Sequence, residues 1–228
     1  VISLVGSEMC IRDSFYSDAM DDVSNFAIKH NIPITQTVMG YSTIKRDHSH
    51  FLGPIGGLGG KAANNLAKQT DLAIAVGTKL ADFTTGSWAN FENPDFSLVS
   101  INVSRFDANK HLAQSVIGDA KVTLQDLSNA LGEWKAPDEW HKKSRDELKN
   151  WNDYVDKESG PTNQELPSYA HAVGAIYRNS DPTDIAVTAA GGLVGEVVQI
   201  WRPKELNNHE TERGFSCMSY EIYCSFCI

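Results

Sequence analysis

The pattern of hydrophobic positions in the first half of the chain alternates between two spacings. Apolar or small side chains recur every three or four positions in residues 23–30, 58–67 and 124–131, so that they share one helix face. Short strand candidates lie between and after these helices, at residues 34–38, 71–78, 96–103 and 115–118. The run at 71–78, DLAIAVGT, is unbroken and apolar until its glycine, which is typical of a strand buried on both faces.

Helices that alternate with strands, without hairpin signals between them, predict an α/β fold with a doubly wound parallel sheet. Residues 39–54 are interpreted as a loop that leads into a glycine-rich run. Asp119 directly precedes the last helical pattern and is a predicted N-cap.

The pattern changes after residue 136. Residues 137–165 are highly charged and contain Pro137 and Pro161, which predicts an exposed helix that connects two domains. A helix, a strand at 184–189, a glycine turn and a second helix follow, and they resemble the opening of a second α/β unit. The predicted division is therefore a central domain at 15–136, a linker at 137–165 and the truncated start of a further domain at 166–228.

The opening residues do not fit this scheme. Residues 4–14, LVGSEMCIRDS, have no amphipathic period, and they look like a translated sequencing-library adapter. They are not a signal peptide, because charges stand where an apolar core should be. We interpret residues 1–14 as non-native, leave them out of the predicted fold, and expect the chain to be a piece of a longer protein.

Composition narrows the classes of partner. The net charge of −9 is spread along the chain without clusters of Lys and Arg, which argues against nucleic acid and anionic membranes as partners. No apolar run approaches the ~20 residues that span a bilayer. The four cysteines form no spaced disulfide framework, so a reducing cytoplasm is expected. Cys224 and Cys227 form a C-x-x-C without a second pair, which we interpret as chance.

The glycine-rich run GPIGGLGGKAANN spans residues 53–65. Residues 57–62 satisfy a loose G-x-G-x-x-A, and Asp82 lies about twenty residues on, as in a dinucleotide-binding fingerprint. That fingerprint needs a buried strand immediately before its first glycine. Here the preceding residues are polar and include Pro54, so we favour a tight turn that lets a helix pack closely on the sheet. A non-catalytic nucleotide-binding module remains an alternative.

Two stretches together resemble thiamine-diphosphate-dependent enzymes. The central-domain pattern of that family is matched by Asp47, His48, Leu52, Gly53, Gly56, Gly59, Ala63, Asn64, Asp71, Gly77, Thr78, Leu80 and Asp82. Residues 184–222 are similar to the start of the diphosphate-binding domain in a hydrolase branch that opens the ring of a cyclic trihydroxy dione in inositol catabolism. The resemblance covers residues 20–222. An acetolactate-synthase or decarboxylase relative is the alternative within the family.

The resemblance implies thiamine diphosphate and Mg²⁺ as cofactors, a cyclic polyol dione as substrate, and a homodimer or homotetramer. It assigns cofactor contact to five residues: Gly191, Gly192, Ser216, Cys217 and Met218. The activating glutamate is expected in an upstream domain, and the G-D-G…N motif that binds Mg²⁺ is expected beyond residue 228. No metal ligand is therefore expected in this chain, and the piece itself is expected to be inactive. A third alternative is that residues 15–136 form an architectural spacer that serves subunit assembly.

The remaining polar residues have weaker assignments. His48 and His50 flank Ser49 in a polar loop, and we interpret them as solvent-exposed. Arg202, Glu212 and the stretch 209–212 are candidates to face the substrate, with surface charge as the alternative. Cys217 is not expected to be a nucleophile, since no motif places a base beside it.

Overall fold

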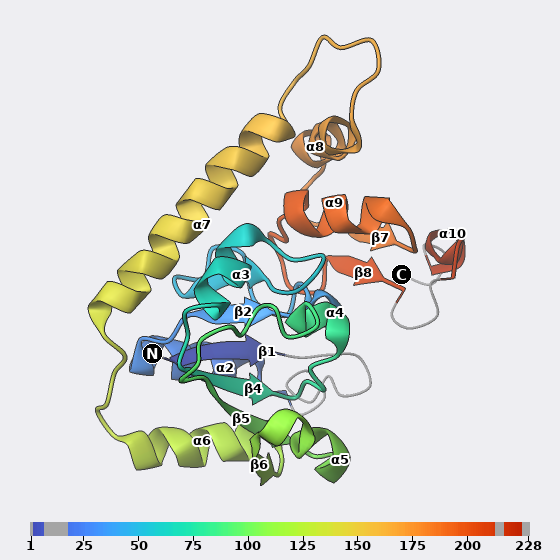
Figure 1. Cartoon of the computed structure of the whole chain (residues 1–228). Coiled ribbons are helices and arrows are strands. Elements are labelled where there is room, and N and C mark those ends of the chain that lie inside the picture. Colours follow the sequence, from blue (N-terminus) through green and yellow to red (C-terminus); the bar gives the residue numbers. More distant parts are fainter. Residues whose placement is uncertain (1, 7–17, 213–216, 225–228) are drawn as a thin grey trace.

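Six parallel strands form one sheet in the computed structural model, which describes residues 2–6, 18–212 and 217–224. The strand order is β3-β2-β1-β4-β5-β6, and each neighbouring pair is parallel (Figure 1). The strands are β1 (Ile2–Gly6), β2 (Ile34–Gln36), β3 (Phe51–Pro54), β4 (Leu72–Val76), β5 (Ser97–Asn102) and β6 (Gln114–Ile117). This order confirms the predicted doubly wound α/β fold.

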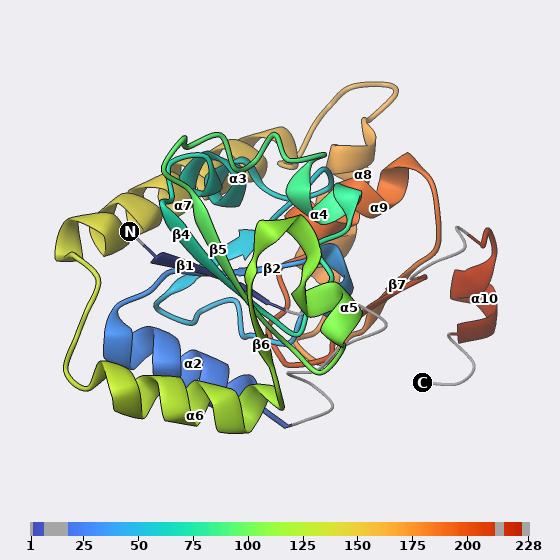
Figure 2. The same ribbon diagram turned by 60° about the horizontal axis from the view of Figure 1, so that its bottom comes forward.

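Helices cover both faces of the sheet, as Figure 2 shows from a second direction. On one face lie α2 (Met20–His30) and α6 (Ala120–Leu131), and on the other lie α3 (Lys61–Ala67) and α7 (Asp138–Glu158). The short helices α4 (Asp82–Thr85) and α5 (Arg105–Ala108) follow β4 and β5, and single 3-10 turns are η1 (Val38–Gly40) and η2 (Lys110–Leu112). As predicted, Asp119 caps α6, where its side chain accepts a hydrogen bond from the amide of Val122 at 3.0 Å.

The alternation of side chains along β4 explains why there are two cores. Ile74 and Val76 pack under α2 and α6, together with Phe26 and Leu124. Their neighbours along the strand, Ala73 and Ala75, face the opposite core under α3 and α7. The small alanine side chains allow α3 to lie close to the sheet.

The exclusion of the opening residues from the fold was wrong for part of them. Residues 2–6 form β1, which lies between β2 and β4 and pairs with both. The physical reason is that the extended backbone of these residues makes hydrogen bonds to the strands on both sides. Five residues are too few for a hydrophobic period to reveal such a strand. Residues 7–14 lie outside the described residues, and the non-native origin of 1–14 stays a prediction.

The interpretation of residues 39–54 as one loop was also wrong. Residues 51–54 form β3 at the edge of the sheet, and all four residues are buried. Pro54 fits there because an edge strand tolerates a residue that lacks an amide proton. The glycines at 56–60 therefore do follow a buried strand, and only their own geometry can exclude a dinucleotide site.

The charged linker is the helix α7, but it is not exposed on all sides. Trp140, Ser144, Leu148 and Val155 are buried, and they recur at helical spacing along one face. This face packs on α3 and β3, and Trp140 and Leu148 join the core that contains Leu52. The high charge of the other face concealed this apolar stripe in the sequence.

A second, smaller unit follows α7. It contains α8 (Tyr169–Asn179), β7 (Ala186–Thr188), α9 (Gly192–Ile200), β8 (His209–Thr211) and α10 (Tyr220–Cys224). Strands β7 and β8 pair in parallel, and α8, α9 and the end of α7 share a cluster around Val155, Val197 and Trp201. Among the described helices, none combines the length and apolar character that crossing a membrane requires.

Candidate functional site

The residues predicted to contact the cofactor follow the carboxyl ends of β7 and β8. Gly191 lies three positions after the last residue of β7 and Gly192 begins α9, while Cys217 and Met218 come after β8. Because β7 and β8 are parallel, the two segments leave the small sheet at the same edge. Ligands of doubly wound proteins bind at this kind of edge. Ser216 lies outside the described residues.

Gly191 and Gly192 form the entry to α9. Gly191 has a φ of +89°, a left-handed conformation that side chains other than glycine rarely adopt. A Cβ atom added at either glycine would meet no described atom within 4 Å, so both backbones face open space. This geometry allows close approach of a ligand to the backbone at the start of a helix.

Cys217 and Met218 are exposed beside this edge. Met218 has 85% of its surface accessible, so it does not belong to a core of the described chain. Tyr220, just after them, donates a hydrogen bond to Oε1 of Glu210 at 3.4 Å and ties the start of α10 to β8. An exposed thioether of this size is suited to contact a ring.

The amides of the glycine run are already used inside the protein. Those of Gly57 and Gly60 donate to the carbonyls of Phe83 at 2.7 Å and Pro54 at 2.8 Å. The amide of Gly59 donates to the carbonyl of Gly56 at 2.9 Å. A phosphate-binding loop must point its amides at the ligand, and these point into the fold.

The same glycines are required by packing. A Cβ atom at Gly56 would lie 2.2 Å from the carbonyl oxygen of Phe83, and one at Gly59 would lie 2.5 Å from the carbonyl carbon of Ile55. At Gly60 it would lie 2.7 Å from Nε1 of Trp151 on α7. These contacts support the interpretation of the run as a tight turn that brings backbone against backbone.

A contact between the two units, which no local pattern predicts, is made by Tyr41 and Ser42. The hydroxyl of Tyr41 donates to the carbonyl of Trp201 at 2.9 Å, and its ring meets His209 edge-on, with 5.2 Å between centroids. The amide of Asn207 donates to the carbonyl of Ser42 at 3.0 Å. Burial raises the pKa of Tyr41 to about 12, so this hydroxyl stays protonated and acts as a donor.

The weaker candidates in the second unit make contacts within the protein, and their place facing the substrate stays a prediction. Arg202 forms an ion pair with Asp156 of α7 at 2.7 Å. His209 is buried under Tyr41, and burial lowers its pKa to about 4. The amide of Glu212 donates to the carbonyl of Thr188 at 3.0 Å and extends the β7–β8 ladder. Arg202 and His209 therefore hold the units together.

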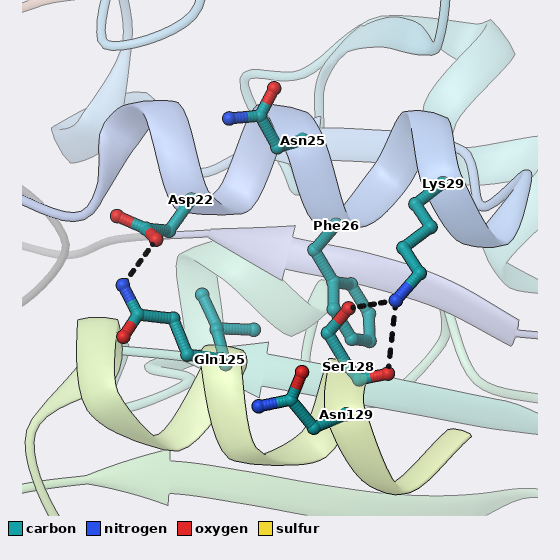
Figure 3. Close-up of a pocket in the computed structure, with 8 residues that line it drawn as sticks. Asp22, Asn25, Phe26, Lys29, Gln125, Ser128 and Asn129 are labelled. Carbon is teal, nitrogen blue, oxygen red and sulfur yellow. Dashed lines mark hydrogen bonds between the residues drawn. The ribbon is translucent and has the colours of Figure 1, made fainter. Parts of the chain in front are cut away.

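A pocket of about 330 Å³ lies between α2 and α6, on the face of the large sheet opposite α3 and α7 (Figure 3). Gln125 donates to Asp22 at 2.8 Å near one end of the pocket. Near the other end, Lys29 donates to the carbonyl and hydroxyl of Ser128 at 3.3 and 3.1 Å. Both sets of hydrogen bonds join α2 to α6. The charged groups of the pocket, Asp22 and Lys29, are therefore already bonded to residues of the neighbouring helix.

The described residues provide no metal centre. Within that part of the chain, no three His, Cys, Asp or Glu side chains gather closely enough to hold an ion. The expected Mg²⁺ motif was assigned beyond residue 228, and that assignment stays a prediction.

Comparisons with known proteins agree with the architecture. A family profile described as the central domain of thiamine pyrophosphate enzymes matches residues 13–127. The chain is also similar to curated bacterial proteins named 3D-(3,5/4)-trihydroxycyclohexane-1,2-dione hydrolase. The protein of Clostridium botulinum (strain Alaska E43 / Type E3) is 36% identical over 234 residues, which cover 92% of this chain and 36% of the relative.

Two further relatives carry the same name. The protein of Geobacillus thermodenitrificans is 34% identical over 232 residues, covering 92% of this chain and 36% of its own length. The protein of Bacillus anthracis (strain CDC 684 / NRRL 3495) is 33% identical over 231 residues, covering 91% and 36%. The chain therefore spans 36% of the length of these relatives, and the alignments include both of its units.

Proposed function

The chain belongs to the family of thiamine pyrophosphate enzymes, and from this premise we propose that it is part of a longer hydrolase that cleaves a carbon–carbon bond in a cyclic trihydroxy dione. One observation carries the proposal: relatives named 3D-(3,5/4)-trihydroxycyclohexane-1,2-dione hydrolase align with 92% of the chain. The alignments extend past the central domain into the second unit, where the central-domain pattern common to many members of the family ends.

The residues of this chain suited to the cofactor are those at the carboxyl edge of β7 and β8. Thiamine diphosphate, when bound, supplies a nucleophilic thiazolium carbon for attack on a ketone and an electron sink. Gly191 and Gly192 would let the cofactor approach the backbone, since no side chain occupies the space beyond them. Met218, exposed at the same edge, would contact the aminopyrimidine ring, with the backbone of Ser216 and Cys217 beside it.

The central domain has a supporting role in this proposal. The amides of its glycine run donate to carbonyls within the protein. This argues against the alternative of a nucleotide-binding module at that run. Tyr41 and its neighbours instead bind the second unit to the central domain. We propose that the activating glutamate and the Mg²⁺ ligands belong to parts of the longer protein, that it works as a homodimer or homotetramer in the cytoplasm, and that these 228 residues alone are inactive.

The test uses a chain of the relatives' full length that carries this sequence. Gly191→Val places a branched side chain in the open space, and we expect a loss of thiamine diphosphate affinity of at least about tenfold in calorimetry. Gly57→Ala is the matched control, because a Cβ there meets only ordinary contacts at 3.7 and 3.8 Å. Unchanged affinity in Gly191→Val would contradict the assigned site.

Substrate identity needs a separate measurement. The proposal predicts hydrolysis of the cyclic dione, with thiamine diphosphate required. Turnover of pyruvate without turnover of the dione would instead favour the acetolactate-synthase or decarboxylase alternative.

A further inference from the structure

Three histidines meet where α7 passes the loop before β3. The rings of His50 and His141 are stacked with 4.2 Å between centroids, and His48 meets His50 edge-on at 6.0 Å. His50 is only 7% exposed, so the expectation of solvent-exposed loop histidines was wrong. The reason is the N-terminal part of α7, which covers this loop from about 90 residues further along the chain.

The hydrogen bonds around His50 link three segments. Nδ2 of Asn31, at the end of α2, donates to the carbonyl of Ala136 at 3.1 Å and to Asp138 at 3.0 Å. Its Oδ1 therefore faces Nε2 of His50, at 3.2 Å, as an acceptor. Nε2 of His50 is thus the protonated nitrogen, and Nδ1 accepts from the hydroxyl of Ser49 at 2.8 Å. Both ring nitrogens of His50 therefore have hydrogen-bond partners when the ring is neutral.

A second proton on His50 would meet an unfavourable set of neighbours. His141 and Arg145 face it from α7, and His48 faces it from its own loop. The nearby carboxylates are engaged elsewhere or beyond direct contact: Asp138 accepts from Asn31, and Asp47 lies beside His48. Burial, together with His141, His48 and Arg145, lowers the pKa of His50 to about 4. Burial also lowers the pKa of His48.

The same part of α7 covers the outer edge of β3. The carbonyl of His50 accepts from the amide of Ile34 in β2, while the next carbonyl, that of Phe51, accepts from Arg145 of α7 at 3.0 Å. His141 also donates to the carbonyl of Ser49 at 3.2 Å. Within the described sheet, β3 pairs only with β2, so α7 protects an edge that could otherwise pair with another strand.

We propose that His48, His50 and His141 form an acid-sensitive latch that holds the first half of α7 over the edge of β3. At neutral pH the neutral ring of His50 packs against the rings of His48 and His141. As the pH falls, a second proton on His50 is disfavoured by burial and repelled by Arg145, and water solvates the new charge once α7 has moved away. Release of α7 exposes the backbone groups of β3, which a second copy of the chain can then pair with.

Linkage sets the size of the effect. When α7 is released, His50 regains an ordinary pKa near 6.5, so the open state takes up a proton that the closed state takes up only near pH 4. The population of the open state is therefore expected to rise at least about tenfold between pH 7 and pH 5.

Hydrogen exchange of the 228-residue chain tests the latch, with rates corrected for the intrinsic effect of pH. We expect the amides of residues 138–148 and 51–54 to open at least about tenfold more at pH 5 than at pH 7, and to exchange faster than those of β4 and β5 at both pH values, since the core strands exchange only through global unfolding. His50→Gln removes the ring whose pKa burial lowers, and His141→Gln removes the ring stacked on it, so each variant should reduce this response. His171→Gln is the control, because His171 lies in α8, outside the latch, and Gln can also serve at its capping-box position.

Two results would overturn the proposal. One is equal protection of residues 138–148 at pH 5 and pH 7. The other is a full acid response that survives in both latch variants. Equal exchange rates in residues 138–148 and in β4 and β5 at pH 5 would show that α7 opens only by global unfolding, and this would overturn the proposal as well. Light scattering gives a second readout: self-association at pH 5 is expected for the original chain and for His171→Gln, and is expected to fall in the double variant His50→Gln/His141→Gln.

Discussion

The side-chain amide of Asn64 makes two hydrogen bonds to the backbone of Gly56. Its Oδ1 accepts from the amide of Gly56 at 2.9 Å, and its Nδ2 donates to the carbonyl of the same residue at 3.0 Å. The first turn of α3 thereby fixes the glycine turn, and Gly56 is held at a φ of +109°. This pair shows that the glycine-rich run is part of the scaffold.

The scaffold role predicts different responses to alanine at adjacent glycines. Gly56→Ala forces a Cβ to 2.2 Å from the carbonyl oxygen of Phe83 at a φ that alanine avoids, so the free energy of unfolding should fall by about 2–4 kcal/mol. Gly57→Ala should change it by less than about 0.5 kcal/mol, because its Cβ meets only ordinary contacts. Urea unfolding of both variants measures the difference, and similar losses would contradict the account.

Tyr41 should contribute to the binding of the two units. Tyr41→Phe keeps the ring against His209 but leaves the carbonyl of Trp201 without this buried donor. We expect the free energy of unfolding to fall by about 1–2 kcal/mol. Tyr154→Phe is the matched control, since Tyr154 is 54% exposed and should lose almost nothing. Equal stability of the two variants, measured by urea unfolding, would show that the contact does not stabilise the chain.

His209 should make stability depend on pH. Its pKa is about 4 in the folded chain and near 6.5 when unfolded, so between these values the unfolded state binds more protons. The stabilisation is complete above pH 6.5 and is lost as the pH falls towards 4. The expected loss from this residue between pH 7 and pH 5 is about 2 kcal/mol.

The variant His209→Phe isolates this contribution. Phenylalanine retains an aromatic ring against Tyr41 and cannot titrate, so the pH dependence of the unfolding free energy should become shallower by that amount. Urea unfolding at pH 5 and pH 7 provides the comparison. A variant whose dependence is as steep as that of the original chain would contradict the assigned role of His209.

The N-cap of α6 offers a smaller test. Asp119→Ala removes the acceptor for the amide of Val122, and the expected loss of stability is about 1 kcal/mol. Asp126→Ala, on the exposed side of the same helix, removes a carboxylate without removing a cap and should have less effect. Thermal unfolding distinguishes them, and a reversed order would contradict the capping assignment.

Local patterns predicted the fold where an element carried its own signal. The spacing of Val23, Phe26 and His30 identified the buried face of α2, and DLAIAVGT identified β4 as a buried strand. The strand β3 was missed because its polar approach and Pro54 suppress strand signals, although an edge position tolerates both. The strand β1 was missed because its pairing, rather than its periodicity, defines it.

Long-range contacts account for the other errors. The burial of His50 depends on α7, and that of His209 depends on Tyr41, which lies 168 positions earlier in the chain. Spacing along the sequence carries no information about such meetings. The predicted cofactor residues Gly191 and Met218 do lie at one edge of the small sheet, but their assignment came from the family resemblance and awaits a binding measurement.

The central proposal is that the longer protein containing this chain opens a carbocyclic ring with the help of thiamine diphosphate. The most direct test is product formation from 3D-(3,5/4)-trihydroxycyclohexane-1,2-dione by a full-length chain carrying this sequence, with and without thiamine diphosphate and Mg²⁺. We predict ring-opened acid only when the cofactor is present. Dione hydrolysis at the same rate without the cofactor, or no hydrolysis by a folded protein that binds it, would contradict the claim.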